Sequence, residues 1–196
     1  NWLPLYWKGY QQTTRYTYRI NDLSDTDVLW SEMQENIRRE IRKAKNKNNV
    51  KIYTDASIDD FLELNKKVFS RQGMAVPYTE KLVRNIHKAA SANNAGVFFI
   101  GEDERRRKHA GVYIVWDEHN AYYLLGGGDP ELRSSGATSL CMYEAIKFAA
   151  TVTKSFDFEG SMIEPIERFF RAFGAVQTPY FAVSKTNSKL LQVYWF

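Results

Sequence analysis

The stretch from Ala121 to Gly160 has the residue types and spacing that favour binding chemistry. Three consecutive glycines, Gly126 to Gly128, follow an aromatic and aliphatic run, and Gly136 with Ala137 then opens an amphipathic helix. Backbone amides at the start of a helix bind anions, because the helix dipole and the free N–H groups favour negative charge there. The arrangement predicts a glycine turn that binds the pyrophosphate of a nucleotide-containing cofactor.

Two carboxylates follow that helix, in the segment 156–159. Side chains alternate along a strand, so Asp157 and Glu159 share one face. Because ligands of open α/β sheets bind at the carboxyl ends of strands, we expect Glu159 to lie near the glycine loop, with Asp157 deeper and structural. The alternative is that Glu159 caps the next helix or pairs with Arg168 or Arg171.

The elements that position these groups follow from hydrophobic periodicity, since alternation predicts strands and three- to four-residue spacing predicts helices. An early strand is predicted at 16–20, and one helix capped by Ser24 or Asp25 carries apolar residues from Trp30 to Ala44. The later order is strand, helix, helix, three meandering strands, helix, strand, helix, strand. The predicted ranges are 50–54, 58–69, 80–92, 96–101, 109–116, 121–125, 137–152, 156–159, 166–173 and 180–184.

Composition indicates a globular chain, since 44% of the 196 residues are hydrophobic and 26% are charged. The net charge of +4 permits a polyanionic partner but does not require one. A single cysteine, Cys141, excludes an internal disulfide and a Cys-rich zinc site, and the three histidines lack metal-ligand spacing, so no metal is expected. A reducing, cytoplasmic setting is predicted. No apolar run approaches the ~20 residues of a membrane span.

Two basic segments are interpreted as solvated surface, because runs of like charge usually stay hydrated. They are the helix face from Arg38 to Lys47 and the hairpin tip from Arg105 to Lys108. The alternatives are a phosphate-rich substrate on the helix and RNA or membrane contact at the tip. Cys141, on the apolar face of its helix, is expected to be a core residue rather than a nucleophile.

The order of elements from Val50 onwards resembles the GNAT acyltransferase fold, an α/β fold whose mixed, mostly antiparallel sheet is flanked by helices on both faces. In that family a loop after the fourth strand grips the pyrophosphate of coenzyme A, with the motif Arg or Gln, two residues, Gly, one residue, Gly or Ala. The segment 133–138 matches at Arg and Gly and departs at Thr138. The resemblance implies acetyl-coenzyme A or another acyl-coenzyme A, bound by Leu125, Gly126, Gly127, Gly128, Arg133, Ser134, Ser135, Gly136 and Ala137.

A narrower resemblance is to the Fem-type peptidyltransferases and related bacterial acetyltransferase-like proteins, which pair two GNAT-like domains. It is carried by the segments 16–18, 41–44, 69–73, 156–161 and 169–174. It implies that residues 1–49 are the C-terminal part of a first GNAT-like half plus a linking helix, that 50–196 is a GNAT-like acyltransferase domain, and that an N-terminal GNAT-like domain is missing.

Fem-type proteins transfer amino acids from aminoacyl-tRNA onto peptidoglycan precursors, or acyl groups from coenzyme A onto amines. Transfer to an amine needs a base for the ammonium proton, and Glu159 is the candidate. The resemblance implies Tyr180 as the donor of a proton to the departing thiolate, as a tyrosine is in many GNAT enzymes; the alternative is a buried structural phenol. Substrate contacts are expected from Arg71, Tyr78, Trp116, Tyr123 and Asp157.

The expected function is therefore that of an acyltransferase. It moves an acyl or aminoacyl group from coenzyme A, or from aminoacyl-tRNA as the alternative donor, to a small-molecule or peptide amine, with a cell-wall precursor as one acceptor. The case for tRNA rests on the two basic segments, and the small net charge weighs against it. The other hypothesis is a non-catalytic GNAT-like domain that binds a cell-wall precursor or a partner protein.

Overall fold

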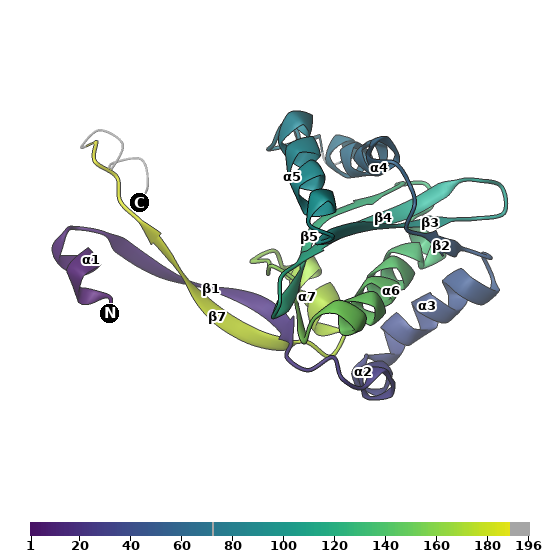
Figure 1. Cartoon of the computed structure of the whole chain (residues 1–196), viewed down its shortest axis with the longest axis horizontal. Helices are drawn as coiled ribbons and strands as arrows, with labels where there is room; N and C mark the ends of the chain where they lie inside the picture. Colours follow the sequence, from purple (N-terminus) through teal and green to yellow (C-terminus); the bar gives the residue numbers. More distant parts are fainter. Residues whose placement is uncertain (72, 189–196) are drawn as a thin grey trace.

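The computed structural model describes residues 1–71 and 73–188, which form one sheet with helices on both of its faces (Figure 1). Gln72 of the predicted helix end and residues 189–196 of the predicted second domain lie outside the described residues. The strands are β1 (Gln11–Ile20), β2 (Lys51–Tyr53), β3 (Gly96–Glu102), β4 (Lys108–Trp116), β5 (Asn120–Gly128), β6 (Ser155–Asp157) and β7 (Val176–Ser184). The helices are α1 (Leu3–Trp7), α2 (Thr26–Glu32), α3 (Glu35–Asn46), α4 (Ile58–Arg71), α5 (Glu80–Ala92), the 3₁₀ turn η1 (Arg133–Ser135), α6 (Ala137–Val152) and α7 (Glu164–Arg171).

The described strands form a seven-stranded sheet in the order β2-β3-β4-β5-β6-β1-β7. All neighbouring strands run antiparallel except β5 and β6, which are parallel. Helices α4 and α5 cover one face, and α3 and α6 cover the other (Figure 1). The predicted fold class, a mixed and mostly antiparallel sheet flanked by helices on both faces, is confirmed.

Each face of the sheet has its own apolar layer, which explains why the helices pack there. Under α4 and α5 the buried side chains are Phe61, Leu64, Phe98, Ile100 and Tyr113. The larger layer, on the side of α3 and α6, contains 27 buried residues, among them Cys141, which has 0% exposure. Its burial raises the pKa of the Cys141 thiol to about 12, so this cysteine stays a protonated core residue, as predicted.

The predicted single helix after residue 25 is in fact two helices, α2 and α3. Asp25 caps the first, its carboxylate accepting from the N–H groups of Asp27 and Val28. The chain then turns out of helical geometry at Met33, whose ψ of 139° is extended, and restarts after Gln34. Periodicity missed this break because the buried residues on either side keep a helical spacing.

Strand β1 is longer than predicted and lies between β6 and β7, antiparallel to both. Its first half and its partner β7 leave the body as a two-stranded ribbon, with α1 at the far end (Figure 1). The ribbon and α1 are largely exposed, with Phe181 of β7 at 62% and Trp7 of α1 at 73%. The described residues on both sides of Asn49 therefore share one sheet, and the predicted division at that point stays a prediction.

Candidate active site

The site begins where β5 and β6 separate. The two strands pair over three residues only, from Asn120 opposite Ser155 to Tyr122 opposite Asp157. Beyond Tyr122, β5 continues to Gly128 beside β4. The second half of β5 thus lacks a neighbour on the β6 side among the described strands, and cavities open there.

Gly126 to Gly128 are the last residues of β5, paired with Val112, Gly111 and Ala110, and do not form the predicted turn. Packing requires at least two of them. A Cβ on Gly127 would lie 2.6 Å from the backbone nitrogen of Asn65 in α4, and one on Gly126 would meet the Tyr123 hydroxyl. The glycines let α4 approach β5 closely and leave room for the Tyr123 hydroxyl beside the end of its own strand.

Asn65, in the middle of α4, connects the end of β5 to Tyr78. Its side chain is 2% exposed, its amide nitrogen donates to the Gly126 carbonyl at 2.7 Å, and its amide oxygen accepts from the Tyr78 hydroxyl at 3.0 Å. Sequence analysis gave it no role. The sequence does place this asparagine on the apolar stripe of its helix. Because a buried amide needs hydrogen-bond partners, that position could have predicted a structural role.

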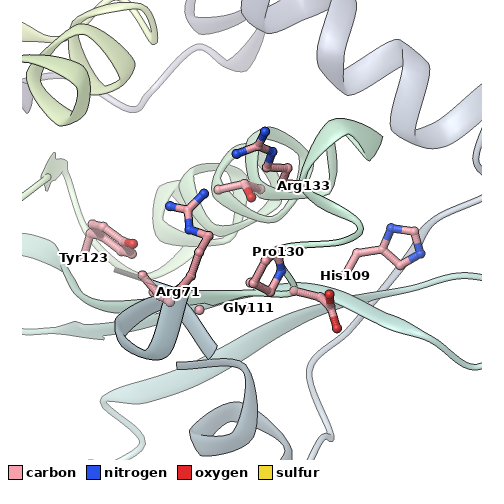
Figure 2. Close-up of a pocket in the computed structure, with 12 residues that line it drawn as sticks. Arg71, His109, Gly111, Tyr123, Pro130 and Arg133 are labelled. Carbon is pink, nitrogen blue, oxygen red and sulfur yellow. The ribbon is translucent and has the colours of Figure 1, made fainter. Parts of the chain in front are cut away.

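A cavity of about 220 Å³ lies between the end of α4, the end of β5 and the start of α6 (Figure 2). Its lining residues come from α4, β4, β5, η1 and α6 and from the loop before η1: Val68, Arg71, His109, Gly111, Tyr123, Gly126, Gly127, Gly128, Asp129, Pro130, Arg133 and Thr138. We call it the arginine cavity.

Arg71 and Arg133 reach the arginine cavity from different elements, and Figure 2 shows both guanidinium groups on the same side of the strands. Neither forms an ion pair within the described residues. The one carboxylate in the lining, Asp129, is bound by Lys67 at 3.0 Å, which lowers the Asp129 pKa and neutralises its charge. The cavity therefore has two uncompensated cations and suits an anionic group such as phosphate.

The start of α6 is only partly open to this cavity. Ser135, Gly136 and Ala137 are buried against α3, while Arg133, Ser134 and Thr138 are exposed. Asn48 donates to the Ser135 carbonyl at 2.9 Å. Gly136 has a φ of 83° and backs onto Glu40, whose carbonyl oxygen would lie 2.2 Å from an added Cβ. Packing against α3 thus explains the glycine of the predicted motif.

A second hollow, of about 440 Å³, lies between β5 and α7, and we call it the aromatic groove. Its walls are mostly apolar and aromatic, with a single carboxylate: Tyr123, Leu124, Thr138, Phe158, Glu159, Gly160, Ser161, Pro165, Ile166, Phe169 and Phe170. Tyr123 and Thr138 line both hollows. A ligand that passes between these two side chains would touch the arginine cavity and the aromatic groove together.

Glu159 is exposed at the edge of the aromatic groove and has a left-handed backbone, with φ 59°. Partial burial, reinforced by the negative charge of Asp157, raises the pKa of Glu159 above its usual range. The predicted alternative partners are engaged elsewhere, since Arg168 pairs with Glu164 and Arg171 with Glu167. Within the described residues Glu159 forms no ion pair.

Asp157 has the structural environment that its depth predicted. Its Oδ1 accepts from the Thr17 hydroxyl at 2.5 Å and from the Glu159 backbone N–H at 2.8 Å, and its Oδ2 lies 3.4 Å from the Nε of Arg19. These contacts tie the turn that carries Glu159 to β1. Its predicted contact with substrate stays a prediction.

Tyr123 stands at the junction of the two hollows, half-buried, with its ring 5.8 Å from that of Phe170. Burial raises the pKa of its hydroxyl, which therefore stays protonated at neutral pH and is able to donate a hydrogen bond to a ligand.

Other predicted site residues lie apart from this junction. Tyr180 is exposed on β7, opposite Arg15 in the ribbon, and lines neither hollow. Trp116 ends β4 and packs on Phe148 at 5.3 Å. Tyr78 supports Asn65, and Leu125 pairs with Tyr113 next to the glycines of β5. Their predicted roles remain untested.

The two basic segments are partly paired with carboxylates within the chain. On α3, Arg38 and Arg42 pair with Glu35, and Lys45 pairs with Glu144 at 2.8 Å. At the tip between β3 and β4, acidic partners are likewise present: Glu102 for Arg106, Asp103 for Arg107 and Asp60 for Lys108. These pairings reduce the positive charge that either segment offers to a nucleic acid, although Arg38 and Arg42 share the one carboxylate of Glu35.

The histidines are dispersed. His109 is buried, with Nε2 3.2 Å from Asp103, and Figure 2 shows its ring directed away from Arg71. His87 packs on Phe98 at 4.5 Å, and burial lowers the His87 pKa. No group of three or more His, Cys, Asp or Glu in residues 1–71 and 73–188 is arranged to hold a metal ion. No helix in the same ranges is long and apolar enough to cross a membrane.

Several solved structures share this fold at low sequence identity. FemX has a TM-score of 0.77 at 14% identity, over 97% of this chain and 69% of that one. The C-terminal domain (DUF2156) of a putative lysylphosphatidylglycerol synthetase from Agrobacterium fabrum has a TM-score of 0.67 at 9% identity. The match covers 97% of this chain and 66% of that one. L-PGS from Bacillus licheniformis has a TM-score of 0.62 at 10% identity, over 96% of this chain and 65% of that one. The chain thus spans about two thirds of the length of these structures.

No curated protein matches the sequence. A family model does: the one described as the acetyltransferase (GNAT) domain matches residues 31–162, which is more than half of the chain and includes β2 to β6 with the arginine cavity. The predicted membership is confirmed, and the chain belongs to the GNAT acetyltransferase domain family, with a Fem-like fold.

Proposed function

We propose that this protein transfers an acyl group from a phosphate-bearing donor to an amine. The donor's anionic part lies against Arg71 and Arg133, its acyl group at Tyr123 and Thr138, and the amine in the aromatic groove beside Glu159. One observation carries the proposal: a cavity with two guanidinium groups joins, through Tyr123 and Thr138, a groove with one carboxylate, and none of these three charges has an ion pair in residues 1–71 and 73–188.

Coenzyme A is the proposed donor, because its phosphates match the arginine cavity. Arg133 of η1 and Thr138 of α6 are exposed, line the cavity and fit such an anion, whereas Ser135, Gly136 and Ala137 are buried. The phosphates are therefore expected on the guanidinium side rather than over Gly136, which is buried against Glu40 of α3. The bound cofactor would supply an activated acyl group.

Aminoacyl-tRNA is the second donor. The likeness of fold to FemX and to lysylphosphatidylglycerol synthetase supports an aminoacyl group as the group transferred. The internal pairing of Arg38, Arg42 and Lys45 weighs against an RNA surface on α3. A cell-wall precursor remains a candidate acceptor, and a first GNAT-like half before residue 50 remains the proposed source of further contacts.

The chemistry needs a base for the ammonium and a donor of hydrogen bonds. Glu159 accepts the proton, and its raised pKa brings it closer to neutral pH, where a general base works best. The free amine then attacks the acyl carbon; as the C–N bond forms and the bond to the leaving group breaks, the second proton of the nitrogen passes to the leaving group. Tyr123, protonated at neutral pH, is proposed to donate to the oxygen or leaving group in place of the more distant Tyr180.

The test compares acyl transfer by the wild type and by Glu159→Gln, with acetyl-coenzyme A and with charged tRNA as donors. Loss of the base should lower kcat by about 10²–10⁴-fold. Because the raised pKa means that ionised Glu159 is destabilising, the variant should keep or slightly raise the melting temperature. Unchanged turnover would remove Glu159 as base, and no turnover by the wild type with any donor would favour a non-catalytic binding domain.

A further inference from the structure

The aromatic groove has a rigid apolar floor. Phe158 and Phe170 are 1% and 4% exposed, with ring centroids 4.9 Å apart, and Phe170 also contacts Tyr123 at 5.8 Å. Because these rings pack on one another, the groove is formed without a ligand. A preformed apolar hollow of this size is the usual setting for a small organic molecule.

The rim of the groove is also apolar. Ile166 lines it and is 40% exposed, and Met162 and Ile163, in the turn before α7, are 63% and 60% exposed. Ile166 lines the hollow, and the chain between the lining residues Ser161 and Pro165 carries the exposed Met162 and Ile163; such exposed apolar surface favours an apolar ligand, since its burial removes contact with water.

Glu159 supplies the one charge in the lining. Its backbone N–H is bound to Asp157 at 2.8 Å, and Asp157 is itself held by Thr17, so the turn that carries the carboxylate is fixed. The carboxylate has no ion-pair partner within the described residues. A cation in the groove would meet this charge and the faces of aromatic rings, both of which attract ammonium groups.

We propose that the groove selects a soluble primary amine with a bulky aromatic or aliphatic substituent and no carboxylate next to the nitrogen. The ammonium lies on Glu159, and the substituent lies against Phe169 and Ile166. A neighbouring carboxylate would be repelled by Glu159 and Asp157, so free amino acids are excluded. The inference rests on the proposed function and names the acceptor class of that site.

The test is a titration followed by amide NMR shifts, with four probes: tryptamine, ethylamine, tryptophan and indole-3-propionate. Tryptamine should shift the amides of Gly160 and Ser161 with a Kd at least about tenfold below that of ethylamine, because it buries the larger apolar area. Tryptophan and indole-3-propionate should bind at least about tenfold more weakly than tryptamine, since each brings a carboxylate.

Two variants and a control test the residues. Glu159→Gln should raise the Kd of tryptamine roughly threefold, as expected for the loss of a partly exposed ion pair. Ile166→Ser should raise this Kd by a similar factor. Leu82→Ser, which removes an equally exposed apolar side chain from α5 outside the groove, should leave the Kd unchanged. Equal affinity for ethylamine and tryptamine, tighter binding of tryptophan, or shifts confined to the arginine cavity would overturn the proposal.

Transfer assays separate this inference from the proposed function. Tryptamine that binds at Gly160 and Ser161 but is not acylated would leave the inference standing and contradict the function. Acylation of a polar amine such as ethanolamine, with no binding or acylation of tryptamine, would leave the function standing and contradict the inference.

Discussion

At the scale of single residues, Gly136 can be explained either by a ligand-binding motif or by packing. The sequence motif assigned it to a phosphate loop, whereas in the fold its left-handed φ of 83° and the carbonyl of Glu40 are sufficient reasons for a glycine. The residues of the same segment that face open space are Arg133, Ser134 and Thr138. Binding at this loop is therefore expected to depend on side chains on either side of the glycine.

Gly136→Ala should destabilise the protein by about 2–4 kcal/mol, from backbone strain plus the clash with Glu40. The matched control is Gly9→Ala, because Gly9 also has a positive φ, of 74°, but nothing lies within 4 Å of an added Cβ. Gly9→Ala should lower the free energy of unfolding by only about 1 kcal/mol. Urea unfolding measures both, and equal losses would contradict the packing explanation.

At the scale of elements, α4 holds the end of β5 in place through Asn65. The helix approaches the strand at Gly127, and the Asn65 amide spans from the Gly126 carbonyl to the Tyr78 hydroxyl. The floor of the arginine cavity thus depends on a buried polar bridge, which is stable only while both of its partners are present.

Asn65→Ala should cost about 2–3 kcal/mol of unfolding free energy, because it leaves the Gly126 carbonyl without its partner. Tyr78→Phe removes one bond of the bridge and should cost about 1 kcal/mol. Since both changes break the same bond, the double variant should lose less than the sum of the two. Additive losses in chemical denaturation would show that the bridge does not couple these residues.

The tip between β3 and β4 is organised by Asp103, which accepts from the N–H groups of Arg105 and Arg107 and from the Arg107 guanidinium at 2.6 and 2.8 Å. Burial opposes ionisation of Asp103, but these bonds outweigh it and hold the Asp103 pKa well below its usual range. The stabilisation is therefore present above the unfolded-state pKa of about 4 and is lost as the pH falls through the folded value.

Asp103→Asn should accordingly lower stability at pH 7 by about 1–3 kcal/mol and reduce the loss of stability on acidification below about pH 4. Glu104→Gln, a neighbouring change at an exposed carboxylate, should leave the curve as in the wild type. Unfolding free energies measured between pH 7 and pH 2 decide this. Parallel curves for the wild type and Asp103→Asn would contradict the assignment.

At the scale of the whole molecule, local signals predicted most elements but not how they assemble. Alternation and capping located β2 to β5, α5 and α6 within a few residues, because those patterns depend on neighbours in sequence. The insertion of β1 between β6 and β7 is a pairing across more than 130 residues, and no local pattern encodes it. The break at Met33 was missed for the same reason, since the Gln34 N–H bonds to the distant Ala172 carbonyl.

For the site, the sequence predicted several of the residues but not how they group in space. Glu159, Arg71, Arg133 and Tyr123 were identified from the sequence and line the two hollows. Their grouping depends on the separation of β5 from β6, which only the assembled sheet reveals. Tyr180 was expected at the site, but β7 extends into the ribbon and carries it away from both hollows.

The central claim is that the two unpaired guanidinium groups of the arginine cavity bind the anionic part of the acyl donor. Its most direct test is calorimetric titration of acetyl-coenzyme A into the wild type and into Arg71→Ala/Arg133→Ala, with Arg39→Ala/Arg105→Ala as a control at exposed arginines outside the cavity. We predict saturable binding to the wild type and the control, and at least about a 30-fold loss in the cavity variant, because two charge-assisted interactions are removed. No binding to the wild type, or equal affinity of all three proteins, would contradict the account.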